Sequence, residues 1–127
     1  MNGECSMEIR VVNLQEKAKL IKGLHQYKLI AEINNYQLKL VKAKREFIWH
    51  SHPETDELFF MVEGQMKLEF RDKIFDLKEG DLIVVPKGAE HKPICVTECT
   101  VMLIEPRDTL NTGNAGGPLT DTNVEWI

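Results

Sequence analysis

The sequence predicts an all-β protein, a jelly-roll barrel preceded by a short helix. From residue 26 onward, apolar and polar residues alternate with the period of two that is typical of strands. Turn-forming pairs separate these stretches at short intervals. Together they indicate about nine strands, the number expected of a jelly roll. We therefore expect an N-terminal arm and helix in residues 1–25, the barrel in 26–105, and a tail in 106–127 that packs on the barrel or on a partner.

The N-terminal region contains one helix signal. Met7–Val12 suits either a first strand or an arm that contacts a partner. Asn13 is followed three residues later by Glu16, which is typical of a helix start, because the asparagine side chain can accept a hydrogen bond from a free backbone amide. Gly23 is a plausible end of this helix.

A first hairpin is predicted around Asn34-Asn35, because asparagine tolerates the positive φ that a two-residue turn requires. This turn would place apolar residues opposite apolar residues on the two strands. The expected pairs are Ile33 with Tyr36, Ala31 with Leu38, and Leu29 with Leu40.

A second hairpin is predicted around Glu63-Gly64. It would create an apolar face on which Glu57 is the only polar member. The apolar members are Phe59, Met61, Met66, Leu68 and Phe70. A lone carboxylate on such a face is costly unless a metal or another partner compensates its charge. Glu57 is therefore a candidate ligand, and the apolar members are candidate pocket lining. Cys95, which has the alternation phase of His91, joins this lining as a small buried residue.

Three of the four histidines lie in two short segments. The first runs from His50 to Glu57 and contains two histidines one residue apart, which face the same way only on an extended strand. The second runs from Gly80 to His91.

The two segments have the patterns H-x-H-x4-E-x6-G and G-x5-P-x-G-x2-H, which resemble the paired signature of the cupin superfamily. The chain looks most like small bacterial single-domain cupins, many of which are named mannose-6-phosphate-isomerase-like. The resemblance implies one divalent metal inside the barrel, bound by His50, His52, Glu57 and His91. Two positions depart from the family pattern, because Lys44 replaces an expected glycine and Cys95 an expected asparagine. They affect loop shape and pocket lining rather than the ligands.

Three imidazoles and one carboxylate suit Fe(II), Mn(II), Ni(II), Zn(II) or Co(II) rather than Ca(II). An octahedral ion with four protein ligands has two further positions for a substrate, dioxygen or water. The fourth histidine, His25, is expected to be solvated, as are Glu54 and Asp56 in the loop between the ligands.

The composition argues against several classes of protein. A net charge of −4 over 127 residues argues against nucleic-acid binding, which needs a basic surface. The N-terminus has no apolar run of the kind found in secretion signals and membrane spans. Three cysteines, an odd number, do not indicate a disulfide framework. A cytoplasmic location is therefore expected.

Three functions are compatible with this reasoning. The first is a metalloenzyme that acts on a small oxygenated metabolite by chelation, with a dioxygenase as the leading example. The second is a sugar-phosphate isomerase. A phosphate needs basic side chains or a helix N-terminus, and the four arginines fall near strand ends or turns rather than in an evident pocket; they are Arg10, Arg45, Arg71 and Arg107. The third is a non-enzymatic module that uses the metal to bind a small molecule, or only to hold the barrel together.

Apolar surface predicts self-association. Leu82–Val85 and Val101–Ile104 are apolar at every position, so both faces of these strands should be covered. Further outward apolar residues are expected at Trp49, Leu58, Phe60 and Val62. Surface of this extent favours a two-fold homodimer. The alternative is that the two ends of the chain cover it.

Overall fold

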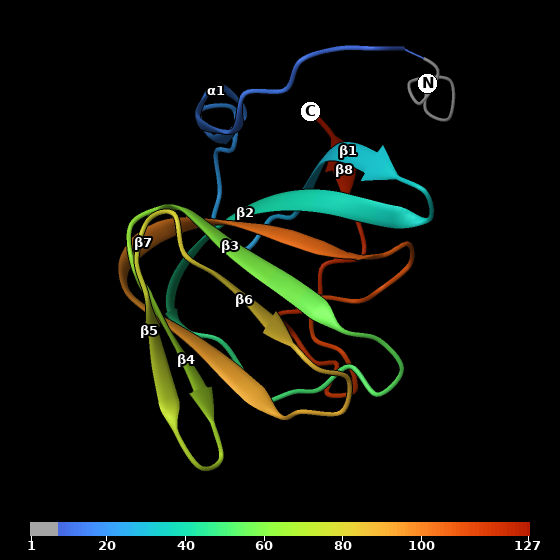
Figure 1. The fold of residues 1–127 in the computed structure, drawn as a ribbon. Coiled ribbons are helices and arrows are strands. Elements are labelled where there is room, and N and C mark those ends of the chain that lie inside the picture. Colours follow the sequence, from blue (N-terminus) through green and yellow to red (C-terminus); the bar gives the residue numbers. More distant parts are fainter. Residues whose placement is uncertain (1–7) are drawn as a thin grey trace.

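The structure, a computed structural model, describes residues 8–127, and in this range it contains one short helix and eight strands (Figure 1). The all-β jelly-roll fold and the short N-terminal helix are confirmed. The elements are α1 (Leu14–Ala18), β1 (Lys28–Ile33), β2 (Tyr36–Glu46), β3 (Glu57–Glu63), β4 (Met66–Phe70), β5 (Ile74–Leu77), β6 (Leu82–Val85), β7 (His91–Pro106) and β8 (Glu125–Trp126).

Helix α1 begins as predicted, because Oδ1 of Asn13 accepts a hydrogen bond of 2.9 Å from the backbone N–H of Glu16. It ends at Ala18, before Gly23. Figure 1 shows α1 outside the strands, at the top of the view. The segment after it buries Ile21 in a small second core beside β1, β2 and β3, made with Ile30, Leu40 and Val62. The described part of the expected arm or strand, residues 8–12, contains no strand, and Met7 lies outside the described residues.

The hairpin of β1 and β2 is confirmed near its turn, where Ile33 and Ala31 have the predicted partners. Further from the turn the prediction is wrong, since Leu29 pairs with Lys39 rather than Leu40. A bulge between Leu29 and Ala31 explains the difference, because an extra residue on one strand shifts every later pair.

The hairpin predicted around Glu63-Gly64 is wrong. Strand β3 pairs with β6 and with the second half of β7, whereas β4 pairs with β5 and with the first half of β7. Gly64, with a φ of 82°, carries the chain between these two parts of the sheet. A Cβ at Gly64 would lie 3.0 Å from the Cβ of Cys99, so the chain crosses directly over β7. The alternation itself is preserved, because the inward residues of both strands are buried.

Strand β7 holds the fold together. It is a single element of 16 residues, and β2 pairs with it almost from end to end. The sheet therefore bends around the main core instead of splitting in two (Figure 1). This core contains Tyr27, Val41, Phe59, Met61, Leu68 and Leu103. No helix within residues 8–127 is long and apolar enough to span a membrane.

The tail after β7 folds back over the barrel. Oδ2 of Asp121 accepts a hydrogen bond of 2.8 Å from the backbone N–H of Tyr27. Strand β8 then pairs in parallel with β1, with Trp126 opposite Leu29. Ile127 packs against the second core beneath α1.

Candidate metal centre

Backbone hydrogen bonds bring the two histidine segments together. The N–H of His50 donates to the carbonyl of His91 at 3.0 Å, and the N–H of His91 donates to the carbonyl of His50 at 2.9 Å. The predicted strand at His50 and His52 is thus reduced to a single bridge. The turn Pro86–Ala89 docks on the same segment, because the N–H of Gly88 donates to the carbonyl of His52 at 3.0 Å. Gly88 has a φ of 82° there, a conformation that favours glycine.

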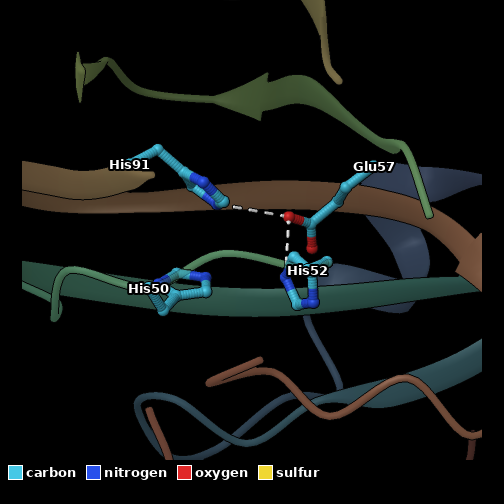
Figure 2. Close-up of side chains that lie close together, drawn as sticks. All are labelled: His50, His52, Glu57 and His91. Atoms are coloured by element: carbon cyan, nitrogen blue, oxygen red, sulfur yellow. Dashed lines mark ion pairs between the residues drawn. The ribbon is translucent and has the colours of Figure 1, made fainter. Parts of the chain in front are cut away.

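Four side chains converge inside this frame (Figure 2). They belong to His50, His52, Glu57 and His91, each at most 5% exposed. Their ligand atoms all lie within 4.8 Å of one another. The Nε2 atoms of His52 and His91 lie 3.2 and 3.4 Å from Oε1 of Glu57. Ligands sit about 2.0–2.2 Å from a bound transition metal, so opposite ligands are about 4.2 Å apart. The cluster is close to this size and could hold a metal ion.

The protonation of the rings supports the same conclusion. Nδ1 of His50 lies 2.9 Å from the carbonyl of Ile48, and Nδ1 of His91 lies 3.0 Å from the carbonyl of Ala89. A carbonyl can only accept, so each Nδ1 carries the proton and each Nε2 is a bare acceptor. These carbonyls are the groups that orient the rings, and the sequence could not identify them.

The inner atoms of the cluster lack donors. Nε2 of His52, Nε2 of His91 and Oε1 of Glu57 are buried without a hydrogen-bond partner, although they are near one another. Nε2 of His91 and Oε1 of Glu57 are both acceptors, and acceptors that face each other in a buried site are unfavourable. A cation at their centre would satisfy all three, so the donor set fits a divalent metal.

The pKa shifts agree with this arrangement. Burial, together with the nearby His91, lowers the pKa of His50 to about 4. Burial alone would raise the pKa of Glu57, but its contacts with His52 and His91 outweigh that effect, and the net shift is downward. At neutral pH the site therefore presents a neutral imidazole at His50 and an anionic carboxylate at Glu57, the forms that bind metals.

A buried ion pair behind Glu57 was not predicted. Nζ of Lys39 donates to Oε2 of Glu105 at 3.0 Å, and both side chains are almost fully buried. Burial and the charge of Glu57 raise the pKa of Glu105. Glu105 could have been found from the sequence, since it continues the inward alternation of Val101 and Leu103.

The tail also supports the site. Oδ1 of Asn114 accepts a hydrogen bond of 2.9 Å from the N–H of Ser51, and the N–H of Asn114 donates to the carbonyl of Ser51 at 3.0 Å. A Cβ at Gly113 would overlap that carbonyl and would approach Cε1 of His52 to 3.2 Å. The segment between the two metal-site histidines is therefore held by the tail, which had been expected to pack on the barrel or on a partner.

An apolar cavity of about 30 Å³ adjoins the cluster. Two aromatic rings connect them, since Phe47 contacts His50 with ring centroids 5.5 Å apart and Phe59 contacts His91 at 5.9 Å. A space of this size holds about two water-sized molecules. Any larger compound can enter only if lining side chains change conformation.

The predicted lining residues fall in three places. Phe59, Met66 and Cys95 line the cavity. Met61 and Leu68 lie in the main core and are fully buried. Phe70 is partly buried beside His91, with ring centroids 6.2 Å apart.

Two expectations about polar residues are wrong. His25 is not solvated, because its ring stacks on Phe47 and its Nε2 lies 3.2 Å from the carbonyl of Lys44. Arg45 lines the cavity, although the sequence had shown no arginine in a pocket. It has a φ of 69°, one residue after the position where the cupin pattern has glycine. Glu54 and Asp56 are exposed, as expected.

A jelly roll with three imidazoles and one carboxylate converging inside it is a candidate metalloprotein. Residues 38–105, more than half of the chain, match the cupin-domain family, so the chain belongs to the cupins.

Several cupins are similar to it. A cupin-2 domain protein from Shewanella frigidimarina is 46% identical, with a TM-score of 0.75 over 76% of this chain and 95% of that one. Protein NMB1881 from Neisseria meningitidis is 34% identical, with a TM-score of 0.71 over 76% of this chain and 99% of that one. Uncharacterized protein YdbB from Bacillus subtilis is 36% identical over 84 residues, 65% of this chain and 74% of that protein.

Proposed function

We propose that this cupin is a metal-dependent enzyme that acts on a small oxygenated metabolite, with oxygenation by dioxygen as the leading reaction class. The observation that carries the proposal is the group of three buried polar atoms, on His52, Glu57 and His91, that have no hydrogen-bond partner.

The charge of the site suits an anionic oxygen compound. Three neutral imidazoles and the Glu57 carboxylate contribute one negative charge, so a divalent ion leaves a net charge of about +1. When bound, such an ion, whether Fe, Mn, Ni, Zn or Co, would act as a Lewis acid toward an oxygen donor in its free positions. The residues of the chain hold the ligand atoms in place, through the carbonyls that fix His50 and His91.

The cavity favours oxygenation over isomerisation of a sugar phosphate. Its volume is about 30 Å³ and its walls are mainly apolar. Dioxygen is small enough to fit this volume and, being apolar, suits these walls. A sugar phosphate has many hydroxyl groups that need polar partners. Within residues 8–127, the cationic side chain lining the cavity is Arg45, which suits the anionic group of either substrate, so the apolar walls and the small volume carry the preference.

A second candidate is a non-enzymatic module in which the metal stabilises the barrel or helps to bind a small molecule. The observation that favours it is burial, because Glu57 is 2% exposed and His91 is 0% exposed. A purely structural ion needs no access for a substrate.

The experiment starts from protein purified without added metal, whose metal content is measured. Small carboxylates, diketones and diphenols are then screened for turnover in air and under argon, with oxygen consumption recorded. Our proposal predicts turnover that needs air and stops when a chelator removes the metal. Turnover under argon would support an isomerase instead. Retained metal without turnover, and a melting temperature that falls on chelation, would support the structural role.

A further inference from the structure

A bulge in β7 places two cysteines side by side. Strand β2 pairs Ala43 with Cys99 and Arg45 with Cys95, so two steps along β2 correspond to four steps along β7. Three residues, 96–98, lie between the cysteines where only Lys44 lies between their partners, and all three are exposed. In a regular strand, residues four apart are separated by about 13 Å. The partners of the two cysteines on β2 are only two residues apart, so the register brings Cys95 and Cys99 to a separation of about 6.6 Å.

The two thiols are in contact in the interior. The Sγ atoms of Cys95 and Cys99 lie 2.7 Å apart, and the residues are 1% and 2% exposed. Both cysteines are free thiols in this structure. Disulfides join residues whose Cα atoms are about 4.4–6.8 Å apart. The separation estimated from the register lies within this range, and the sulfur atoms already face each other at 2.7 Å, so the bulge favours a bond between them.

The surroundings distinguish the two thiols chemically. Cys95 lines the small cavity, together with the cationic Arg45. A hydrogen bond from Cys99 lowers the pKa of Cys95, whereas the same hydrogen bond and burial raise the pKa of Cys99. The thiolate is the reactive form of cysteine, so Cys95 is the better nucleophile and Cys99 is placed to react second.

We propose that Cys95 and Cys99 form a peroxide-reactive dithiol site, in which a small hydroperoxide converts the pair into an intramolecular disulfide. The cavity next to Cys95, about 30 Å³, has room for hydrogen peroxide, which is little larger than water. The dithiol site shares this cavity with the function proposed above but uses none of the four metal-cluster residues, so it does not depend on that function.

The reaction balances with the peroxide as the oxidant. The Cys95 thiolate attacks one peroxide oxygen, the O–O bond breaks, and the leaving hydroxide takes up a proton to become water. Cys95 is then a sulfenic acid. Sγ of Cys99 attacks Sγ of Cys95, the S–O bond breaks, and the second hydroxide leaves as water with the proton of Cys99. Two thiols and one hydrogen peroxide thus give one disulfide and two waters.

The test uses the full chain with Cys5→Ser, so that Cys95 and Cys99 are the only cysteines left. The buffer contains a chelator that prevents metal-catalysed oxidation. Hydrogen peroxide is added, free thiols are alkylated, and tryptic peptides are analysed by mass spectrometry. Residues 88–107 form one peptide with both cysteines, since Pro93 blocks cleavage after Lys92. We expect this peptide to lose both alkylatable thiols and two hydrogens, and dithiothreitol to restore them.

Two single variants separate the roles of the thiols. Cys99→Ala should stop at a sulfenic acid on Cys95 that dimedone traps, and Cys95→Ala should leave Cys99 unreactive. The proposal is overturned if both thiols of the Cys5→Ser chain stay alkylatable at peroxide concentrations that oxidise free glutathione. It is equally overturned if Cys95 gains oxygen atoms while Cys99 remains alkylatable. Both of these outcomes are read on the chain that keeps the pair, so they do not depend on how the alanine variants fold.

Discussion

The imidazole rings of His50 and His91 lie 4.3 Å apart, centroid to centroid, and two backbone hydrogen bonds join the same two residues. Two segments distant in sequence therefore form one rigid unit before any metal binds. Such preorganisation lowers the entropy lost on binding. It also leaves acceptor atoms close together in the metal-free protein, so a bound ion should stabilise the fold.

The stability of the metal-free protein should depend on pH through His50. Its pKa falls from 6.5 to about 4 on folding, so between these values the unfolded chain binds more protons. The free energy of unfolding therefore has its full value, as far as His50 is concerned, above pH 6.5 and decreases as the pH falls toward 4. A pKa difference of one unit corresponds to about 1.4 kcal/mol, so protonation of His50 lowers the free energy of unfolding by up to about 3 kcal/mol. The downward shift at Glu57 acts in the same direction.

This pH dependence can be measured by urea denaturation of chelator-treated protein from pH 7 to pH 4. His50→Gln, which is neutral throughout, is the control and should show a shallower loss of stability. Identical slopes for the two proteins would contradict the burial of a neutral imidazole at His50.

Asn114→Ala should weaken both the fold and the metal site, because it removes the acceptor for the N–H of Ser51. Loss of such a hydrogen bond costs about 1 kcal/mol or more when the remaining donor is buried. Metal affinity should fall with it, since Ser51 lies between two of the cluster histidines. Asn123→Ala is a matched control, because Asn114 and Asn123 are both exposed in the same tail but the bond to Ser51 belongs to Asn114. Metal titration and melting curves would test this, and equal behaviour of the two variants would argue against a supporting role for Asn114.

Lys39→Met should be strongly destabilising, because it leaves Glu105 buried without its cation. Breaking a buried ion pair costs about 3–5 kcal/mol, and we expect the lower end, since the raised pKa of Glu105 allows it to become neutral. Lys28→Met, which breaks a pair with the exposed Glu125, should cost less than about 1 kcal/mol. Chemical denaturation would distinguish them, and similar losses would mean that the buried pair is not important to the fold.

We propose that the chain is a homodimer. In the single chain, Leu82 and Val84 are 57% and 52% exposed on the outer face of β6, and Ile9 and Val11 are almost fully exposed. Light scattering at micromolar concentration should give about twice the chain mass of 14.6 kDa. Val84→Lys should reduce that mass if β6 is in the interface. A monomeric wild-type protein would show that this apolar surface stays exposed to water.

The cluster residues could be predicted from sequence because the information is local. The spacing of His50 and His52 requires extended backbone, and the chemistry of imidazole and carboxylate does not depend on how the strands pair. Burial of Met61 and Leu68 was predictable for the same reason, since alternation determines which face a residue occupies.

The strand pairing could not be predicted in the same way. Gly64 suits a hairpin turn and a crossing equally well, and only the contact with Cys99 on β7 decides between them. The roles of Arg45 and Asn114 have the same origin, because each depends on a segment distant in sequence that composition does not identify. The cysteine pair depends on a bulge, which changes the spacing of side chains without a clear signal in the sequence.

Whether the three histidines and Glu57 bind a divalent metal can be measured from the metal content of four proteins purified in parallel. Wild-type protein should contain about one transition-metal ion per chain. His91→Ala should contain almost none, and Glu57→Gln, which keeps the size but removes the charge, should contain much less. His25→Ala is the control, because His25 lies outside the cluster, and it should match the wild type. Equal metal content in wild type, His91→Ala and Glu57→Gln, with all of them folded by circular dichroism, would contradict the account.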